Sequence, residues 1–318
     1  LRLAFMGTPD FAVPSLQILI ENCYNVIAVV TQKDKPKDRG HTMKMPPIKE
    51  VALAHNIPVL QSEKLSKDVH SVEDIKALKP DVIVTCAFGQ ILPKSVLEIP
   101  TYGTINVHGS LLPKYRGAAP IHWAVINGEA KTGITTMFTD IGLDTGDMLL
   151  KDEIDITEDM TVAELHDLMA NLGAHTLLKT LEALKKGNLE RTPQDHSQAT
   201  YAPKIEKTTG RIDWSQSTQR IHNLIRGTTP WPGAYTHLGS LKMRLWNSMI
   251  IDDKYCETCN PGTILAIDKD GMRIKTGDGS ILIKEVQIEA KKKMTPWQYA
   301  CGNSLEKGMT CAICIESE

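Results

Sequence analysis

Apolar runs and amphipathic segments alternate along residues 1–108. The runs hold consecutive Val and Ile, which is typical of parallel strands covered on both faces. They predict strands over Leu1–Met6, Asn25–Thr31, Pro58–Leu60, Asp81–Cys86 and Thr104–His108. Between them, Thr8 and Pro9 are a candidate N-cap and first residue of a helix toward Ile20, and Pro47–His55 predicts a second helix. The alternation predicts an open, doubly wound, mostly parallel α/β sheet, which binds ligands at the carboxyl ends of its strands.

The pattern changes in the second half of the chain. Thr161 and Glu164 form a candidate capping box for a long amphipathic helix over Thr161–Lys186. A polar stretch and a short helix over Thr218–Arg226 follow, and then alternating strands. Turn signals separate these strands at Asp268–Gly271 and Thr276–Gly279. We therefore expect a first domain over 1–188, a linker over 189–209, and a smaller antiparallel β-barrel or sandwich domain over 210–318.

The nucleotide-binding signatures of doubly wound sheets are missing from the sequence. Gly7-Thr8-Pro9 follows the first strand where G-x-G-x-x-G would stand, and G-x-x-x-x-G-K-[ST] occurs nowhere in the chain. A dehydrogenase or a P-loop enzyme is therefore disfavoured.

The bulk composition is that of an ordinary globular protein, with 42% hydrophobic and 23% charged residues. No apolar run is long enough to span a bilayer, and the first residues read as a strand, so we expect a cytoplasmic protein without a membrane partner. Seven scattered cysteines fit a reducing compartment. Cys256/Cys259 and Cys311/Cys314 have a spacing that suits zinc, but the pairs lie far apart, and we expect free thiols and no metal.

Charge is unevenly distributed, although the net charge is only −2. Residues 201–300 hold 15 Lys and Arg against 10 Asp and Glu, whereas residues 1–200 hold 20 against 25. The segment Lys33–Lys49 holds six basic residues against two acidic ones. Such runs are commonly solvated surface, but a basic second half can also bind phosphates.

Candidate chemistry gathers at the end of the last predicted strand. Asn106 and His108 are two residues apart and so lie on the same face of that strand, at its carboxyl end. The loop Asp140–Asp147 carries three carboxylates among its glycines. This loop lacks the spacing of an EF-hand and could be a simple turn. We favour a carboxylate partner for the imidazole, because a neighbouring negative charge stabilises the protonated form of histidine.

The stretch Asn106–Gly117, N-V-H-G-S-L-L-P-K-Y-R-G, resembles the signature of folate-dependent formyltransferases. Further stretches resemble the methionyl-tRNA branch of that family, namely Phe5–Phe11, Phe88–Pro93, Gly142–Asp147, Ile212–Trp214 and Pro230–Gly233. The resemblance covers nearly the whole chain. It implies a Rossmann-like formyltransferase fold followed by an OB-like β-barrel. The paired cysteines of the tail depart from the family pattern.

The resemblance also implies a reaction. The α-amine of an aminoacylated initiator tRNA attacks the formyl carbon of 10-formyltetrahydrofolate, and a tetrahedral intermediate with an oxyanion results. Protonated His108 and the amide of Asn106 would stabilise that oxygen. Asp144 would tune His108 and help to move the proton from the amine to the departing folate nitrogen. No metal is required.

The binding residues that the resemblance implies fall into two groups. Folate would be bound by Ser110, Leu111, Leu112 and Pro113, together with Phe88, Gly89, Gln90, Ile91 and Leu92, whose backbone groups would contact the pterin edge. Leu111 and Leu112 could equally be ordinary core residues. The tRNA would be bound by Arg39, Lys44, Lys204, Lys207, Arg211, Lys242, Lys291, Lys292 and Lys293.

Two other functions remain open at this point. A folate-dependent formyltransferase that acts on a small amine, such as an amino-sugar nucleotide, would have nearly the same first domain; only the basic loop and the basic second half favour tRNA. A tRNA-binding module without catalysis would leave Asn106, His108 and Asp144 unexplained. We expect the chain to act as a monomer.

Overall fold

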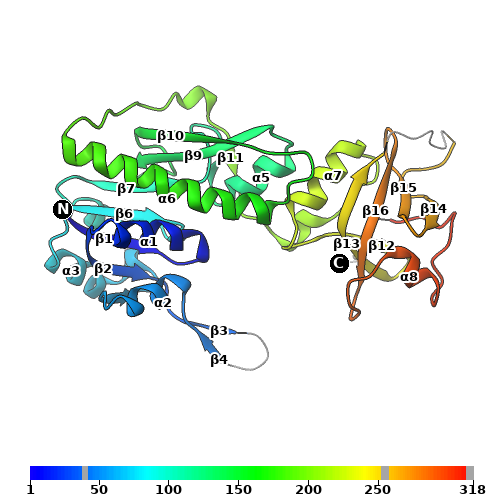
Figure 1. Ribbon diagram of the computed structural model, residues 1–318, viewed down its shortest axis with the longest axis horizontal. Coiled ribbons are helices and arrows are strands. Elements are labelled where there is room, and N and C mark those ends of the chain that lie inside the picture. The colour runs from blue at the N-terminus through cyan, green and yellow to red at the C-terminus, as the bar shows by residue number, and fades with distance from the viewer. Residues whose placement is uncertain (38–41, 252–257, 313–318) are drawn as a thin grey trace. The chain divides into compact units, whose positions relative to one another are not determined.

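The computed structural model describes residues 1–37, 42–251 and 258–312 (Figure 1). Contacts divide the chain into two compact units. Unit 1 comprises Leu1–Pro120, Thr132–Ile154 and His166–Pro203, and unit 2 comprises Ile121–Lys131, Asp155–Leu165 and Lys204–Glu318. Residues 189–203 of the segment predicted as a linker therefore belong to unit 1, and only its last six residues, 204–209, belong to unit 2.

A seven-stranded sheet forms the centre of unit 1, with the strand order β10-β9-β7-β6-β1-β2-β5. Its strands are β1 (Arg2–Gly7), β2 (Asn25–Thr31), β5 (Val59–Gln61), β6 (Val82–Cys86), β7 (Thr104–His108), β9 (Lys131–Phe138) and β10 (Met148–Asp155). The pairs from β5 to β7 are parallel, and β9 runs antiparallel to β7. The predicted mostly parallel sheet is confirmed.

Helices and short strand pairs complete unit 1. The helices are α1 (Val13–Glu21), α2 (Pro47–Ala54), α3 (Val69–Ala77), α4 (Lys94–Leu97) and α6 (Val162–Lys186), of which α6 begins in unit 2. Two small ladders pair β3 (Lys35–Lys37) with β4 (Thr42–Lys44), and β8 (Arg116–Gly117) with β11 (Tyr201–Ala202). Among the described residues no helix is long and apolar enough to cross a membrane.

The long helix α6 packs against the sheet over β7 and β9 (Figure 1). Its capping box is confirmed: the Thr161 N–H and hydroxyl donate to the Glu164 carboxylate, and the Glu164 N–H donates to Thr161 Oγ1. A Cβ at Gly173 would lie 3.0 Å from Val107 Cγ1, so the glycine lets α6 approach β7 closely. On β9, Thr136 Oγ1 bonds Thr180 Oγ1 of α6 at 2.8 Å. β7 is thereby fixed from a neighbouring strand and from a helix.

The first helix begins later than predicted, and the expected cap at Thr8 is wrong. A 3-10 turn over Asp10–Ala12 precedes α1, whose early proline is Pro14. The Thr8 hydroxyl instead donates to the Phe88 carbonyl at 3.3 Å and accepts the Gln32 N–H at 3.4 Å. A short-range cap was thus displaced by contacts between loops that follow three different strands.

Unit 2 is built on a five-stranded antiparallel sheet in the order β12-β13-β16-β15-β14. Its elements are α5 (Pro120–Ile126), α7 (Thr218–Gly227), β12 (Ala234–Leu238), β13 (Leu241–Ile250), β14 (Ile264–Asp268), β15 (Gly271–Lys275), β16 (Ser280–Ile288) and α8 (Pro296–Ala300). Both predicted turns join strands as expected. Trp214, Ile221 and Ile225 pack with the inward face of the sheet in one apolar core.

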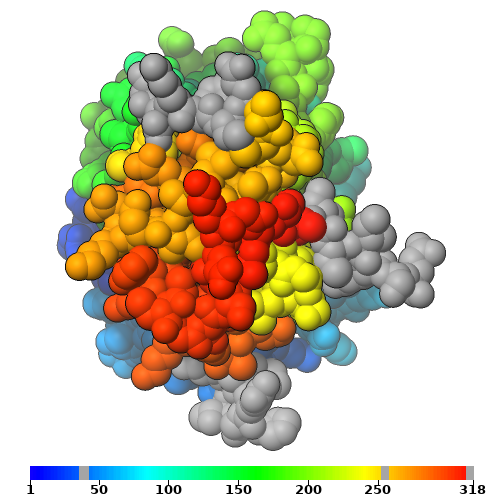
Figure 2. Space-filling view, turned by 90° about the vertical axis from the view of Figure 1, so that its right-hand side faces the viewer, coloured from blue at the N-terminus to red at the C-terminus, as the bar shows by residue number. Residues whose placement is uncertain are grey.

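The segment 308–312 joins the two edges of this sheet. On the β12 side, His237 and Ala312 exchange both backbone hydrogen bonds, and on the β14 side Ile264 bonds Met309 and Gly308. Figure 2 shows this red segment at the surface beside the yellow of β12 and β13. Because both edges have partners, the antiparallel sheet is closed in the manner of a barrel.

Cysteine environments differ sharply. Cys23 and Cys301 are exposed free thiols, and Cys86 and Cys311 are buried free thiols. Burial raises the pKa of Cys86 and of Cys311 to about 12. Cys259 is disulfide-bonded, so the expectation of a free thiol there is wrong. Cys256 and Cys314 lie outside the described residues.

We predict that Cys86 and Cys311 resist thiol reagents in the folded protein. A thiol with a pKa of about 12 is about 10⁻⁴ thiolate at pH 8, and the thiolate is the nucleophile. Peptide mapping by mass spectrometry after maleimide treatment should show native labelling of Cys23 and Cys301, and labelling of the buried pair only after unfolding. Native labelling of Cys311 as fast as that of Cys301 would contradict the packing described for unit 2.

Candidate active site

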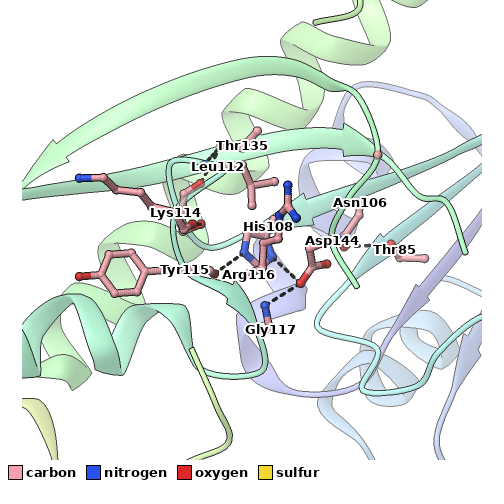
Figure 3. Close-up of polar contacts among 12 residues, drawn as sticks. Thr85, Asn106, His108, Leu112, Lys114, Tyr115, Arg116, Gly117, Thr135 and Asp144 are labelled. Carbon is pink, nitrogen blue, oxygen red and sulfur yellow. Dashed lines mark hydrogen bonds and ion pairs between the residues drawn. The ribbon is translucent and has the colours of Figure 1, made fainter. Parts of the chain in front are cut away.

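His108 ends the central strand β7 and is 5% exposed. Its Nε2 lies 2.9 Å from the carbonyl oxygen of Tyr115 (Figure 3). A carbonyl oxygen only accepts hydrogen bonds, so Nε2 must carry a proton. The Tyr115 N–H in turn donates to Thr200 Oγ1 at 2.8 Å, and Tyr115 has a φ of 58°. The Tyr115 carbonyl therefore fixes the tautomer and the orientation of the imidazole.

Asp144 faces the other nitrogen of this ring. Its Oδ2 lies 3.8 Å from His108 Nδ1 and accepts the Gly117 N–H at 2.8 Å. Asp144 adopts the left-handed region with a φ of 51°. Gly117 has a φ of +112°, and a Cβ there would lie 2.8 Å from the Ala202 carbonyl oxygen, so only glycine suits this position. The predicted pairing of His108 with a carboxylate of the loop 140–147 is thus present in the geometry.

Asn106 lies two residues before His108 on the same strand and is half-buried. Its Oδ1 accepts a hydrogen bond from Thr85 Oγ1 at 3.0 Å. Thr85 is the residue paired with Asn106 in the parallel register of β6 and β7. With Oδ1 held in this way, the Nδ2 donors of Asn106 face away from Thr85 and have no partner among the described residues. This amide is therefore oriented as a donor.

Most backbone N–H and C=O groups of the loop 110–113 already have hydrogen-bond partners within the protein. Thr135 Oγ1 donates to the Ser110 carbonyl at 2.7 Å and accepts the Leu112 N–H at 3.1 Å. Lys151 Nζ donates to the Leu112 carbonyl at 2.6 Å, and the Ser110 hydroxyl donates to the Lys114 carbonyl. Leu112 is buried, which matches its alternative reading as a core residue, whereas Leu111 and Pro113 are half-buried. These contacts give the loop one rigid shape.

The loop 88–92 is different, because its backbone is largely unpaired. The Phe88 carbonyl accepts from Gln32 Nε2 at 3.0 Å, and the Gln90 side chain bonds the Leu65 N–H and the Ser62 carbonyl. Within the described ranges, no partner is found for the backbone N–H and C=O groups of residues 89–92. Ile91 is 79% exposed. This loop is anchored by the Phe88 carbonyl and the Gln90 side chain, and the backbone groups of residues 89–92 are free among the described residues.

Several residues around His108 and Asp144 were not predicted as site residues. Arg116 is 2% exposed, and its Nε and Nη2 donate to Gln194 Oε1 at 3.1 and 2.7 Å. The Gln194 amide group donates to the carbonyls of Asp144 and Gly146. Thr85 could have been found from the register of β6 and β7, but Gln194 lies in the segment predicted as a linker. Burial lowers the pKa of Lys151 from its ordinary value.

The predicted tRNA-binding positions are distributed over both units. Lys44 of unit 1 and Lys204, Lys207, Arg211, Lys291, Lys292 and Lys293 of unit 2 are exposed, and Lys242 is half-buried. Arg39 lies outside the described residues. In the part of the chain that the structure describes, no group of three or more His, Cys, Asp or Glu could hold a metal ion.

Cations and aromatic rings share the outward face of the unit 2 sheet. Lys242 Nζ lies 3.9 Å from the ring centroid of Tyr235, and Lys293 Nζ lies 3.9 Å from that of Trp246. Register pairs Arg244 with Tyr235, so its side chain lies on the same face. Arg244 was not among the predicted tRNA-binding residues. We call Tyr235, Lys242, Arg244, Trp246 and Lys293 the basic aromatic face.

Known proteins match both halves of the chain. The sequence model described as formyl transferase matches residues 1–181, and that of the formyl transferase C-terminal domain matches residues 204–304. The chain is 54% identical over 308 residues to the methionyl-tRNA formyltransferase of Acetivibrio thermocellus, covering 97% of this chain and 98% of the relative. It is 52% identical over 309 residues to that of Clostridioides difficile, covering 97% and 99%. The chain belongs to the methionyl-tRNA formyltransferase family.

Solved structures share the formyltransferase fold at lower identity. WlaRD, a sugar 3N-formyl transferase in the presence of dTDP and 5-N-formyl-THF, matches with a TM-score of 0.68 at 20% identity, covering 92% of this chain and 99% of that one. HypX from Aquifex aeolicus in complex with tetrahydrofolic acid matches with a TM-score of 0.61 at 19% identity, covering 98% and 50%. At such identities the likeness concerns the fold alone.

We predict that Thr85→Val lowers kcat by about twofold to tenfold, because a side-chain hydrogen bond contributes about 0.5–1.5 kcal/mol and here it orients Asn106. Valine keeps the shape of threonine, so the thermal midpoint should change little. Steady-state kinetics with a melting curve measures both. An unchanged kcat would mean that Asn106 needs no orienting partner.

Proposed function

We propose that this protein transfers a formyl group from 10-formyltetrahydrofolate to the α-amine of methionyl initiator tRNA, acting as a monomer. The observation that carries the proposal is the convergence of Asn106, His108 and Asp144 at the carboxyl end of β7, in a chain about half identical to methionyl-tRNA formyltransferases over nearly its whole length. The unpaired backbone groups of the loop 88–92 could bind folate, and the basic aromatic face could bind the phosphates of tRNA.

The site geometry supports an attack by a neutral amine. In the reaction a C–N bond forms between the methionyl nitrogen and the formyl carbon, and the bond from that carbon to the folate nitrogen breaks. The carbonyl oxygen becomes an oxyanion in between. The Nδ2 donors of Asn106 and a protonated Nδ1 of His108 are the groups that can stabilise it. The Tyr115 carbonyl holds Nε2 of the ring, and Nδ1 faces the Asp144 carboxylate.

Asp144 is placed for the proton transfer. Its Oδ2 is engaged by the Gly117 N–H, while its Oδ1 has no hydrogen-bond partner among the described residues. Oδ1 can therefore accept the proton that the attacking amine loses and return it to the departing folate nitrogen. The 3.8 Å separation from His108 Nδ1 leaves the imidazole free to donate to the substrate oxygen.

The two loops beside the strand ends divide the binding of folate. The free backbone groups of residues 89–92 are of the kind that a flat heterocycle with several donors and acceptors requires. The loop 110–113 contributes shape rather than backbone hydrogen bonds, because the Ser110 carbonyl and the Leu112 N–H are already bonded to Thr135. We therefore assign the pterin contacts to the loop 88–92 and a packing role to Leu111 and Pro113.

The basic aromatic face of unit 2 is our candidate for contacts with the tRNA backbone. Lys242 and Lys293 each lie over a nearly buried aromatic ring, so their ammonium groups are held at the surface before a ligand arrives. Phosphate contacts of this kind position a nucleic acid without reading its sequence. The exposed Lys204, Lys207, Arg211, Lys291 and Lys292 are further candidates, as are Lys44 and Arg39 in the first unit.

A formyltransferase for a small amine is not favoured. The sugar N-formyl transferases share the fold at about 20% identity, whereas the methionyl-tRNA enzymes share about half of the residues. A binding module without catalysis leaves the His108 and Asp144 arrangement without purpose.

We predict that His108→Ala and Asp144→Asn each lower kcat by about 10²–10³-fold with retained folding, because each removes one preorganised group from the transition state. Single-turnover formylation of methionyl initiator tRNA, with circular dichroism as the folding control, measures this. Uncharged tRNA and an amino-sugar nucleotide serve as negative substrates. Wild-type rates in either variant, or preferred formylation of the sugar, would overturn the assignment.

We predict that Arg244→Ala and Lys242→Ala raise the KM for methionyl-tRNA and leave the KM for folate unchanged. Each lost phosphate contact should make the dependence of log affinity on log salt shallower by about one unit. Lys76→Ala is the matched control, because Lys76 is an exposed lysine of α3 in unit 1. Equal effects of Lys76→Ala and Arg244→Ala would show that only net charge matters.

A further inference from the structure

The buried side-chain amide of Gln194 connects Arg116 to the loop that carries Asp144. Gln194 is 6% exposed, and all four of its hydrogen-bonding positions are used. Its Oε1 accepts from Arg116 Nε and Nη2, and its Nε2 donates to the carbonyl oxygens of Asp144 and Gly146 at 2.8 Å each. The bonds from Arg116 carry a positive charge and are therefore of the stronger kind.

Other contacts hold the two ends of this loop: the Asp140 carboxylate accepts the Gly142 N–H and the Thr145 hydroxyl, and Asp147 forms an ion pair with Arg191. At Asp144 itself the loop is held by Gly117 and Gln194. Asp144 lies in the left-handed region, which costs a residue other than glycine some conformational free energy. At Gly146 a Cβ would come within 1.8 Å of the Phe138 carbonyl oxygen, so the backbone must pass at this place without a side chain. The Asp144 carboxylate is fixed at one end by the Gly117 N–H, and its main chain is fixed at the other by Gln194.

The charge pattern explains why an amide, and not a carboxylate, stands at position 194. Among the described residues Arg116 makes no ion pair with Asp or Glu; besides Gln194, its guanidinium contacts His196 Nδ1 at 3.2 Å. A glutamate would pair with Arg116, but it could not donate to two carbonyl oxygens, and its negative charge would repel them. Only a group that accepts on one side and donates on the other serves both neighbours.

We propose that Gln194, clasped by Arg116, is a positioning residue that sets where the Asp144 carboxylate stands relative to His108. The inference rests on the proposed formyl transfer. A residue in the segment predicted as a linker thereby takes part in the chemistry of unit 1. Gln194 acts through Asp144 and touches no substrate, so its loss should affect the rate of the chemical step rather than the binding of either substrate.

The decisive variant is Gln194→Glu, because it keeps a partner for the buried Arg116 while it replaces the two donations to the loop with repulsion of the same carbonyl oxygens. We expect kcat to fall by about 10- to 100-fold, from a misplaced proton acceptor, while the KM values for folate and methionyl-tRNA stay within about twofold. In the Asp144→Asn background the same substitution should have almost no further effect on kcat, since residues that act as one unit are not additive.

Gln198→Glu is the matched control, since Gln198 is exposed in the same segment and receives the same change of charge. Circular dichroism and a melting curve check folding; if Gln194→Glu does not fold, Arg116→Lys, which loses the two-pronged contact with Oε1, is carried through the same cycle with Asp144→Asn. Multiplicative losses in the double variants, or a wild-type kcat in the single ones, would overturn the proposal. A wild-type enzyme that fails to formylate methionyl-tRNA would instead contradict the proposed function itself.

Discussion

The hydrogen bond from His108 Nε2 to the Tyr115 carbonyl is the constraint on which the site depends. It joins the end of the buried strand β7 to Tyr115, seven residues later in the chain, and it leaves Nδ1 as the nitrogen that faces Asp144. The loop is itself rigid, because the Tyr115 N–H is bonded to Thr200 and the Ser110 carbonyl to Thr135. A fixed carbonyl gives a fixed imidazole.

The surrounding elements hold the end of β7 in place. β7 lies between β6, which orients Asn106 through Thr85, and β9, which supplies Thr135 to the loop. α6 packs on Val107, and the ladder of β8 and β11 brings Gly117 to the Asp144 carboxylate. Hydrogen bonds from Thr85 and Gly117 hold one side of Asn106 and of Asp144, while the Asn106 Nδ2 donors and Asp144 Oδ1 have no partner among the described residues. Groups held in this way stay aimed at a charge that appears only during reaction.

Much of this could be predicted from the sequence where local patterns decide the outcome. The apolar run Thr104–His108 matches β7, and the capping box at Thr161 is present as predicted. The Thr8 cap failed because its hydroxyl bonds Phe88, 80 residues away. Gln194 was not predicted because its partners are 78 and about 50 residues away in the chain, and the surrounding polar composition resembles a linker.

The most direct test of this account is the protonation of the His108 ring nitrogens. ¹⁵N NMR of protein labelled at its 10 histidines, with His108→Gln to identify the signal, distinguishes a protonated from an unprotonated ring nitrogen. The Tyr115 carbonyl requires Nε2 to carry the proton in the neutral ring and Nδ1 to gain one on acidification. A neutral His108 protonated at Nδ1 and bare at Nε2 would contradict the arrangement from which the whole mechanism follows.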